Sequence, residues 1–246
     1  MDLPRILAIG KFLPSDLDVS VSASNRKIDP AVEGQLEALW EAKMKKAAEE
    51  GRICYNGMSY RLNALKEQDG RIHLDFGTFE YKVRDGLLAI PEYFQLTEEY
   101  YRKGCYTGAT VKTSDDHYLM VELSGKSMNE NKTDLLGGIM ETTIDLRMGS
   151  DVFKSLHAEL EEEGSISQAD IAGAYLRALI LGEKTNVQFY FEVVLKTSLG
   201  EVLQKFKDNS DEDVKSLVAF SRENYLLHLR NHAADSKRSV AELLSI

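Results

Sequence analysis

A segment with two helical stripes, residues 152–166, constrains the fold of this chain more than any other part of its sequence. At about 100° per residue, its apolar side chains fall on one stripe that would face a hydrophobic core: Val152, Phe153, Leu156 and Leu160. Glu159, Glu162 and Glu163 fall on the neighbouring stripe, because they are spaced at i, i+3 and i+4. Like charges at these spacings repel each other, so a cation among them would explain the cluster. The segment therefore predicts a helix that packs on a core and carries a magnesium site.

The residues before and within this helix resemble the Nudix box of the Nudix hydrolases. The second half of the box reads R-E-U-x-E-E-x-G-U, where U is a bulky aliphatic residue, and Glu159, Glu162 and Glu163 stand at its acidic positions. Many family members also carry an upstream Gly-Gly-x-x-Glu turn, which Gly137-Gly138 and Glu141 match here. The resemblance implies a magnesium-dependent hydrolase, with manganese as a second suitable metal. It assigns the metal to the three helical glutamates and to a backbone carbonyl near Gly138.

Three upstream segments are similar to the N-terminal extension of the Nudix branch that includes the UDP-glucose and UDP-galactose pyrophosphatases: residues 51–57, 60–62 and 74–82. Residues 119–127 then resemble the strand and basic turn that lead into the Nudix loop. This resemblance implies that the substrate is a nucleoside diphosphate-linked small molecule, with a UDP-sugar as the leading class. Hydrolysis of its diphosphate linkage would give a nucleoside monophosphate and a sugar phosphate.

The resemblance also implies an α/β (α+β) fold, a Nudix-type α/β/α sandwich around a mixed sheet. We expect residues 1–102 to form a β-rich N-terminal extension made of a strand, a helix and a β-hairpin. This extension would pack on a Nudix-like domain of residues 103–246, which includes C-terminal helices.

Two further roles follow from the family resemblance. The general base comes either from the box or from a later loop, so the candidates are Glu163, then Glu141, then Asp211-Glu212-Asp213, which is also typical of an acidic helix cap. Several side chains could contact the phosphate or sugar of the substrate, although each is also typical of an ordinary strand or loop surface: Arg61, Tyr81, Lys82, Arg84 and Lys126.

The box departs from the family pattern at three residues. Its arginine is replaced by Ala158, its upstream glutamate by Ile144 and its glycine by Ser165, and the chain between Gly138 and Ala158 is longer than in the box. Because the family arginine braces the glutamates, its loss motivates an alternative function: a catalytically degenerate Nudix-like module that binds a nucleotide or a protein. A third interpretation is that the glutamates form only a solvated helix face.

The composition narrows the class of protein. A net charge of −10 argues against a nucleic acid partner, because polyanions bind to basic surfaces, whereas a divalent metal would still let a phosphorylated small molecule bind. No segment approaches the ~20 apolar residues of a bilayer span, and the first residues lack a targeting pattern. Cys54 and Cys105 are far apart, which indicates neither a zinc site nor a disulfide framework. We expect a cytoplasmic protein without a membrane partner, and its oligomeric state stays open.

Hydrophobic periodicity and turn residues predict the order of the elements. Near the N-terminus we expect a strand at 5–12, a serine-rich loop at 15–27, and a helix capped by Asp29 that ends near Gly51. The remaining predictions are β-rich runs at 52–66 and 71–83 joined by a hairpin turn at 68–70, a short helix at 91–101, strands at 106–113, 118–123, 174–182 and 187–196, and helices at 199–206, 212–220 and from 224 onward.

Other catalytic motifs are absent from the sequence. His228 and His232 have the spacing of two metal ligands on one helix face, but the glutamate of the zinc protease pattern does not follow His228. The sequence also contains no G-x-S-x-G elbow, no G-x-G-x-x-G fingerprint and no G-x-x-x-x-G-K-[ST] loop. The acidic helix and its diglycine turn therefore remain the candidate site.

Overall fold

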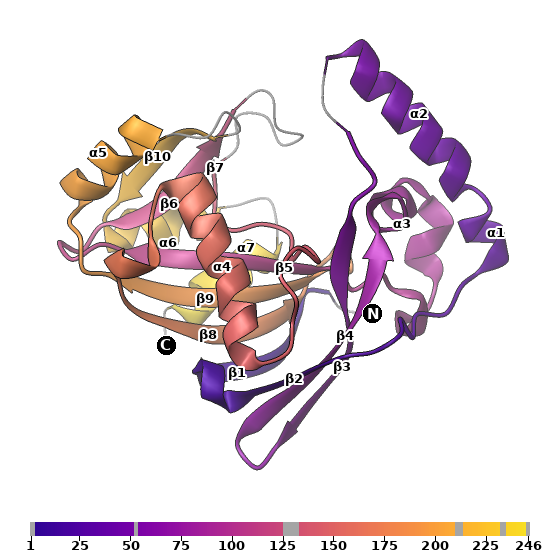
Figure 1. The fold of residues 1–246 in the computed structure, drawn as a ribbon, viewed down its shortest axis with the longest axis horizontal. Coiled ribbons are helices and arrows are strands. Elements are labelled where there is room, and N and C mark those ends of the chain that lie inside the picture. Colours follow the sequence, from indigo (N-terminus) through magenta and orange to yellow (C-terminus); the bar gives the residue numbers. More distant parts are fainter. Residues whose placement is uncertain (1–2, 52–53, 125–132, 210–213, 232–234, 245–246) are drawn as a thin grey trace.

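The chain folds into a larger mixed sheet with a smaller sheet beside it, as a computed structural model of residues 3–51, 54–124, 133–209, 214–231 and 235–244 shows (Figure 1). The larger sheet has the strand order β1-β8-β9-β5-β6-β10, with β7 paired to β6, and of these strands only β5 and β9 run parallel to each other. Its strands are β1 (Arg5–Phe12), β5 (Cys105–Lys112), β6 (Tyr118–Leu123), β7 (Thr133–Asp134), β8 (Ile171–Leu181), β9 (Val187–Leu195) and β10 (Val214–Phe220).

Helices cover both faces of the larger sheet. Helices α4 (Gly149–Gly164) and α5 (Leu199–Asn209) pack on one face, and α6 (Arg222–Arg230) and α7 (Asp235–Leu243) pack on the other. Alternation along β9 explains both contacts, because Phe189 and Phe191 join the cluster of α4 whereas Tyr190 joins that of α6 and α7. The α/β/α sandwich around a mixed sheet that we predicted is therefore confirmed.

The smaller sheet shares the hydrophobic core of the larger one. Its strands are β2 (Leu17–Val21), β3 (Met58–Gln68) and β4 (Arg71–Glu80), in the order β2-β4-β3. Phe76 of β4 is fully buried and stacks on Phe189 of β9 with ring centroids 5.8 Å apart. The two sheets are thus joined through one continuous apolar cluster.

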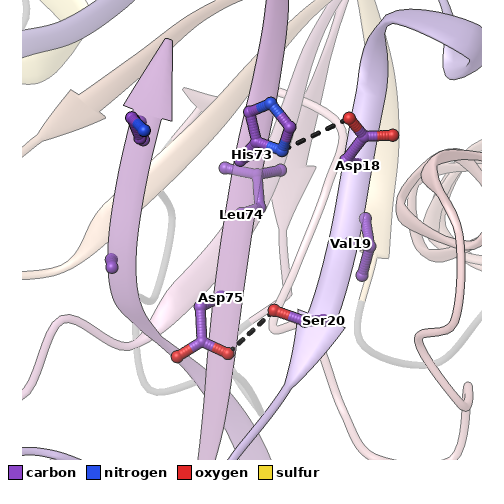
Figure 2. Close-up of a pocket in the computed structure, with 8 residues that line it drawn as sticks. Asp18, Val19, Ser20, His73, Leu74 and Asp75 are labelled. Atoms are coloured by element: carbon purple, nitrogen blue, oxygen red, sulfur yellow. Dashed lines mark hydrogen bonds and ion pairs between the residues drawn. The ribbon is translucent and has the colours of Figure 1, made fainter. Parts of the chain in front are cut away.

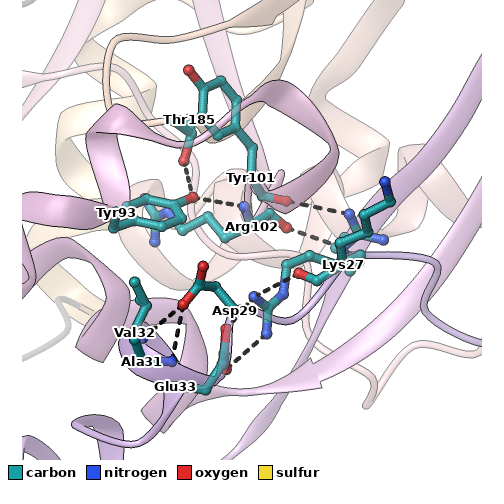
Figure 3. A network of polar contacts seen from close by, with 11 residues as sticks. Lys27, Asp29, Ala31, Val32, Glu33, Tyr93, Tyr101, Arg102 and Thr185 are labelled. Carbon is teal, nitrogen blue, oxygen red and sulfur yellow. Dashed lines mark hydrogen bonds and ion pairs between the residues drawn. The ribbon is translucent and has the colours of Figure 1, made fainter.

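Short helices complete the part of the chain that carries the smaller sheet: α1 (Pro30–Glu33), α2 (Leu36–Glu49) and α3 (Tyr81–Gly86). Asp29 caps α1 as predicted, since its carboxylate accepts hydrogen bonds from the N–H groups of Ala31 and Val32 (Figure 3). The Tyr93 hydroxyl lies 2.6 Å from the Thr185 hydroxyl and accepts a bond from the N–H of Arg102. These bonds tie the helical segment to the loop between β8 and β9.

Strand β1 belongs to the larger sheet, where it pairs with β8 in antiparallel register. The smaller sheet and the helices α1 to α3 therefore lie between β1 and β5 along the chain. The division of the chain at residue 102 into an extension and a Nudix-like domain stays a prediction.

One predicted helix is wrong. Residues 212–220 were expected to be helical, but β10 occupies Val214–Phe220 and pairs with β6. A register shift between Val214 and Ser216 explains the error, because the irregularity lets Val214 and Leu217 both be buried although they are three residues apart. A spacing of three looks helical in the sequence.

Other elements differ from the prediction in their local form. The serine-rich stretch expected as a loop contains β2, which runs parallel to β4, and Ser20 donates a hydrogen bond to Asp75 across this pair (Figure 2). The helix expected at 91–101 is two 3-10 turns, Pro91–Gln95 and Glu98–Tyr100. The expected strand at 71–83 ends at Glu80, where α3 begins. None of the helices in the described ranges has the length and apolar content of a membrane span.

The shared core gives the first testable prediction. Phe76→Ala should lower the free energy of unfolding by about 3–5 kcal/mol, because the substitution leaves a cavity between the two sheets. Urea unfolding should still show one transition. Phe94→Ala is the control, since the Phe94 side chain is 45% exposed and its removal should cost far less. A second transition in Phe76→Ala, with the larger sheet unaffected, would contradict a common core.

Candidate functional site

Helix α4 places two of the predicted glutamates beside the diglycine turn. Its apolar stripe is buried as predicted, with Val152, Leu156 and Leu160 at 0% exposure. On the next stripe Glu159 and Glu163 are half-buried, whereas Glu162 is exposed. The helix ends at Gly164 and is capped by Ser165, which has a φ of +52° and so takes the left-handed conformation that glycine usually supplies at a helix end. The serine in place of the box glycine thus keeps the expected helix terminus.

The two glycines of the turn allow the carboxylates to approach. A Cβ atom at Gly138 would lie 2.3 Å from Oε2 of Glu159. Gly137 has a φ of +144°, and a Cβ atom there would lie 2.4 Å from the carbonyl oxygen of Thr107. Its N–H donates a hydrogen bond of 2.8 Å to Oε2 of Glu163. Both carboxylates therefore depend on a turn without side chains.

The half-buried carboxylates have perturbed pKa values. Burial, and then the charges of Glu162 and Glu141, raises the pKa of Glu159 to about 7. Burial is also the main cause that raises the pKa of Glu163 to about 8, although its bond from the turn acts in the opposite direction. No Lys, Arg or His within the described ranges forms an ion pair with Glu159 or Glu163. The ionised forms of Glu159 and Glu163 are therefore disfavoured at this edge of α4, and neither carboxylate has a cationic partner among the described residues.

Glu141 belongs to the same electrostatic cluster. It pairs with Ser59 of β3 through an isolated bridge, so the end of the turn lies against the smaller sheet. Its Oε1 accepts a hydrogen bond from the hydroxyl of Tyr81 and another, of 3.2 Å, from the hydroxyl of Tyr55. The charge of Glu141 also contributes, after burial and Glu162, to the raised pKa of Glu159.

The donor atoms suit magnesium or manganese, which prefer hard oxygen ligands. In the described part of the chain, no three His, Cys, Asp or Glu side chains already converge as a complete metal site. A magnesium site does not require three converging side chains, because Mg²⁺ often takes one or two carboxylates and completes its coordination shell with waters and substrate phosphates. The carbonyl of Gly138 accepts a hydrogen bond of 2.8 Å from the N–H of Thr107 and keeps a second lone pair. Half-buried carboxylates without a cationic partner fit such an ion.

Two of the predicted substrate-binding residues lie beside the cluster. Tyr81 bonds to Glu141, and the guanidinium carbon of Arg84 lies 4.1 Å from the centroid of the Tyr81 ring. Arg84 is 6% exposed and bonds to Asp85, but its Nη1 is buried with no hydrogen-bond partner among the described residues. A buried guanidinium nitrogen without a partner is costly, so this atom is a place for a water molecule or an anionic group.

Arg61 and Lys82 have other surroundings. Arg61 is 2% exposed and donates to the carbonyl oxygens of Tyr101 and Arg102 and to the side chains of Asn25 and Asn63. These partners all lie outside the carboxylate cluster. Lys82 pairs with Glu37 and Glu80. Three further candidates, Lys126, His232 and the run Asp211-Glu212-Asp213, lie outside the described residues.

The sequence did not single out Tyr55 or Thr107. Tyr55 bonds to Glu141 from a position 86 residues earlier in the chain. The hydroxyl of Thr107 accepts a bond of 3.3 Å from the N–H of Gly138. Neither contact produces a local pattern in the sequence. The two residues of each contact meet only when the diglycine turn pairs with β3 and β5. The similarity of residues 51–57 to the Nudix extension was the one available signal for Tyr55.

No family model matches this sequence, and no curated protein does. Among similar solved structures is a Nudix hydrolase from Nitrosomonas europaea, at 16% identity, 58% coverage of this chain, 88% of that chain and a TM-score of 0.39. The Nudix domain of Shewanella oneidensis NrtR, complexed with ADP ribose, matches at 12% identity, 63% and 95% coverage and a TM-score of 0.39. A bifunctional NMN adenylyltransferase/ADP ribose pyrophosphatase from Francisella tularensis matches at 13% identity, 67% and 46% coverage and a TM-score of 0.43. Similarity at this level assigns no activity to the chain.

The raised pKa values predict how the stability of the metal-free protein depends on pH. Native Glu159 and Glu163 hold protons more tightly than ordinary glutamates, so the folded state binds more protons than the unfolded state between pH ~4.5 and ~8. The free energy of unfolding should therefore fall as pH rises through this range. After allowance for solvent screening, we expect a loss on the order of 2 kcal/mol.

Urea unfolding in EDTA at pH 5.5 and 8.5 would measure this loss. Glu163→Gln should reduce the difference between the two pH values, because its amide does not ionise. Glu161→Gln is the matched control, since Glu161 is an exposed neighbour on the same helix. An unchanged difference in Glu163→Gln would show that Glu163 titrates normally.

The contacts of Arg61 predict a structural effect. Arg61→Ala should destabilise the fold by about 3 kcal/mol, because four buried or half-buried acceptors lose their charged donor. Thermal unfolding would measure the loss. Arg71→Ala on the same hairpin is the control, as Arg71 is 47% exposed and pairs only at the surface with Asp18. A normally stable Arg61→Ala protein with weaker substrate affinity would instead identify a binding residue.

Proposed function

We propose that this chain is a divalent metal-dependent Nudix hydrolase that cleaves the diphosphate linkage of a nucleoside diphosphate derivative. One observation carries the proposal. Helix α4 holds Glu159 and Glu163 against the diglycine turn, with the charge of Glu141 close by and no described cationic side chain paired to either helical glutamate. Such a concentration of carboxylates is unfavourable for the isolated chain and is explained by a bound cation.

The metal ligands in this proposal are Glu159, Glu162, Glu163 and the carbonyl of Gly138. Magnesium is the first choice and manganese the second, since every donor is an oxygen atom. When bound, the metal would neutralise charge on the diphosphate oxygens and lower the pKa of the attacking water. Glu162 is exposed, which suits a ligand that reaches toward the open side of the site.

The general base is assigned to Glu163 first and to Glu141 second. One oxygen of Glu163 accepts the N–H of Gly137, which fixes the carboxylate and leaves the other oxygen to receive a proton from water. Both tyrosine hydroxyls that bond to Glu141 use its Oε1, so Oε2 is equally left to receive a proton. Either carboxylate is thus oriented by hydrogen bonds before a substrate arrives.

A UDP-sugar is the leading substrate class, on the similarity of the N-terminal segments to the UDP-sugar branch. Tyr81 and Arg84 support an anionic sugar phosphate or nucleotide near Glu141, because Tyr81 bonds to Glu141, Arg84 packs on the Tyr81 ring, and one buried guanidinium nitrogen has no partner among the described residues. The second candidate function is a catalytically degenerate module that binds a nucleotide or protein. Ala158 motivates it, since this exposed residue cannot brace the glutamates as the family arginine does.

Product analysis tests the enzyme proposal. The purified chain with Mg²⁺ or Mn²⁺ should convert UDP-glucose, UDP-galactose or another nucleoside diphosphate derivative, such as ADP-ribose, to a nucleoside monophosphate and a phosphorylated sugar. Glu162→Gln and Glu163→Gln should each lower kcat/KM on the order of 100-fold or more, because misplaced or missing ligands remove the metal from its working position.

Two controls make the result decisive. Glu161→Gln should keep full activity, since Glu161 is exposed and its pattern position is not acidic in the box. Circular dichroism and thermal unfolding should show that the inactive variants are folded. Tight binding of a nucleotide without turnover across the whole diphosphate panel would favour the degenerate module.

A further inference from the structure

An exposed aromatic ring borders the carboxylate cluster. Tyr55 is 57% exposed, and its hydroxyl donates a hydrogen bond of 3.2 Å to Oε1 of Glu141. Met58, which begins β3, is 41% exposed, and its carbonyl oxygen accepts the N–H of Thr142, the residue after Glu141. Apolar surface and carboxylates therefore meet at one edge of the candidate site.

The Tyr55 ring is held in place by its neighbours. Its centroid lies 5.6 Å from that of Tyr81, with the rings tilted by 43°. Gly57 makes this approach possible, because a Cβ atom there would lie 2.8 Å from the Tyr55 ring and 3.0 Å from the Tyr81 ring. Tyr81 is itself buried and packed against the guanidinium group of Arg84. The exposed ring is thus fixed by a hydrogen bond at its tip and by a second ring beside it.

A rigid aromatic ring is a favourable surface for a planar ligand. Tyrosine offers a large contact area with few rotatable bonds, so little conformational entropy is lost when a ligand stacks on it. Every nucleobase has a face that can stack on an aromatic side chain. A nucleoside diphosphate derivative joins such a base to a diphosphate, which matches an exposed ring next to a group of carboxylates suited to a metal.

We propose that Tyr55 is a specificity-determining residue whose exposed ring stacks on the nucleobase of the substrate. The inference rests on the proposed function and adds to it. Stacking distinguishes a diphosphate that carries a base from one that does not, and it discriminates weakly among bases. The chain should therefore prefer nucleoside diphosphate derivatives over base-free diphosphates, through Tyr55.

Kinetics with paired substrates test this role. The substrates are UDP-glucose, or the best nucleoside diphosphate of the panel, and the methyl ester of glucose 1-diphosphate, which has the same linkage without a base. Tyr55→Ala should raise KM for the nucleotide substrate about 10-fold relative to Tyr55→Phe, as expected from base–aromatic stacking. The two variants should have the same kcat/KM for the base-free substrate.

The comparison of Tyr55→Ala with Tyr55→Phe measures the contribution of the aromatic ring alone. Both variants lose the hydrogen bond to Glu141, so any effect of that bond on kcat is common to them. Phe94→Ala is a second control, because Phe94 is also a large exposed aromatic residue but packs on Tyr93. Equal losses for both substrates, or equal KM values in Tyr55→Ala and Tyr55→Phe, would overturn the stacking role.

The inference can fail separately from the proposed function. If no diphosphate is hydrolysed, the hydrolase proposal fails. The stacking role is then tested by calorimetric titration of the same proteins with UMP and AMP. A dissociation constant about 10-fold weaker in Tyr55→Ala than in Tyr55→Phe supports it. The absence of binding, or equal binding by the two variants, overturns it.

Discussion

The close approach of helix α4 to the diglycine turn is the constraint on which the rest of the site depends. Gly138 against Glu159 and Gly164 against Leu136 permit it, and Gly137 lets the turn pack on the backbone of Thr107 in β5. A side chain at any of these places would collide with a neighbour at less than 3 Å. The same contact that buries the apolar stripe of α4 therefore also sets the distance between its carboxylates and the turn.

This closeness has an electrostatic cost for the folded chain. Burial and mutual repulsion raise the pKa values of Glu159 and Glu163, which means that the ionised forms are held less favourably than in water. The larger sheet and its helices offset the cost through an extensive apolar core. A site of this kind is stabilised by whatever cation it binds, so ligand binding and folding stability are linked.

Local patterns in the sequence predicted the helices and strands that depend on residue spacing or on a capping side chain. The apolar stripe of α4, the Asp29 cap and the strands around the central sheet all follow from spacing or from capping chemistry. Strand β10 was not predicted as a strand, because a bulge places its buried residues at a spacing that is typical of a helix. The bonds from Tyr55 and Tyr81 to Glu141 join residues 86 and 60 positions apart, and only the pairing of distant strands brings them together. The acids of the site and Tyr81 could be read from the sequence as candidates, but the contacts of Tyr55 and Tyr81 with Glu141 could not.

The position of β1 in the larger sheet has a consequence for how the site is supported. Since β1 pairs with β8 and the chain returns to the same sheet at β5, the smaller sheet is attached at both of its ends, like an insertion within one fold. A lobe tethered twice and sharing a core cannot swing as a hinged arm on a single linker would. Tyr55 and Tyr81, which this lobe contributes, both bond to Glu141, so hydrogen bonds as well as the shared core join the lobe to the carboxylate turn.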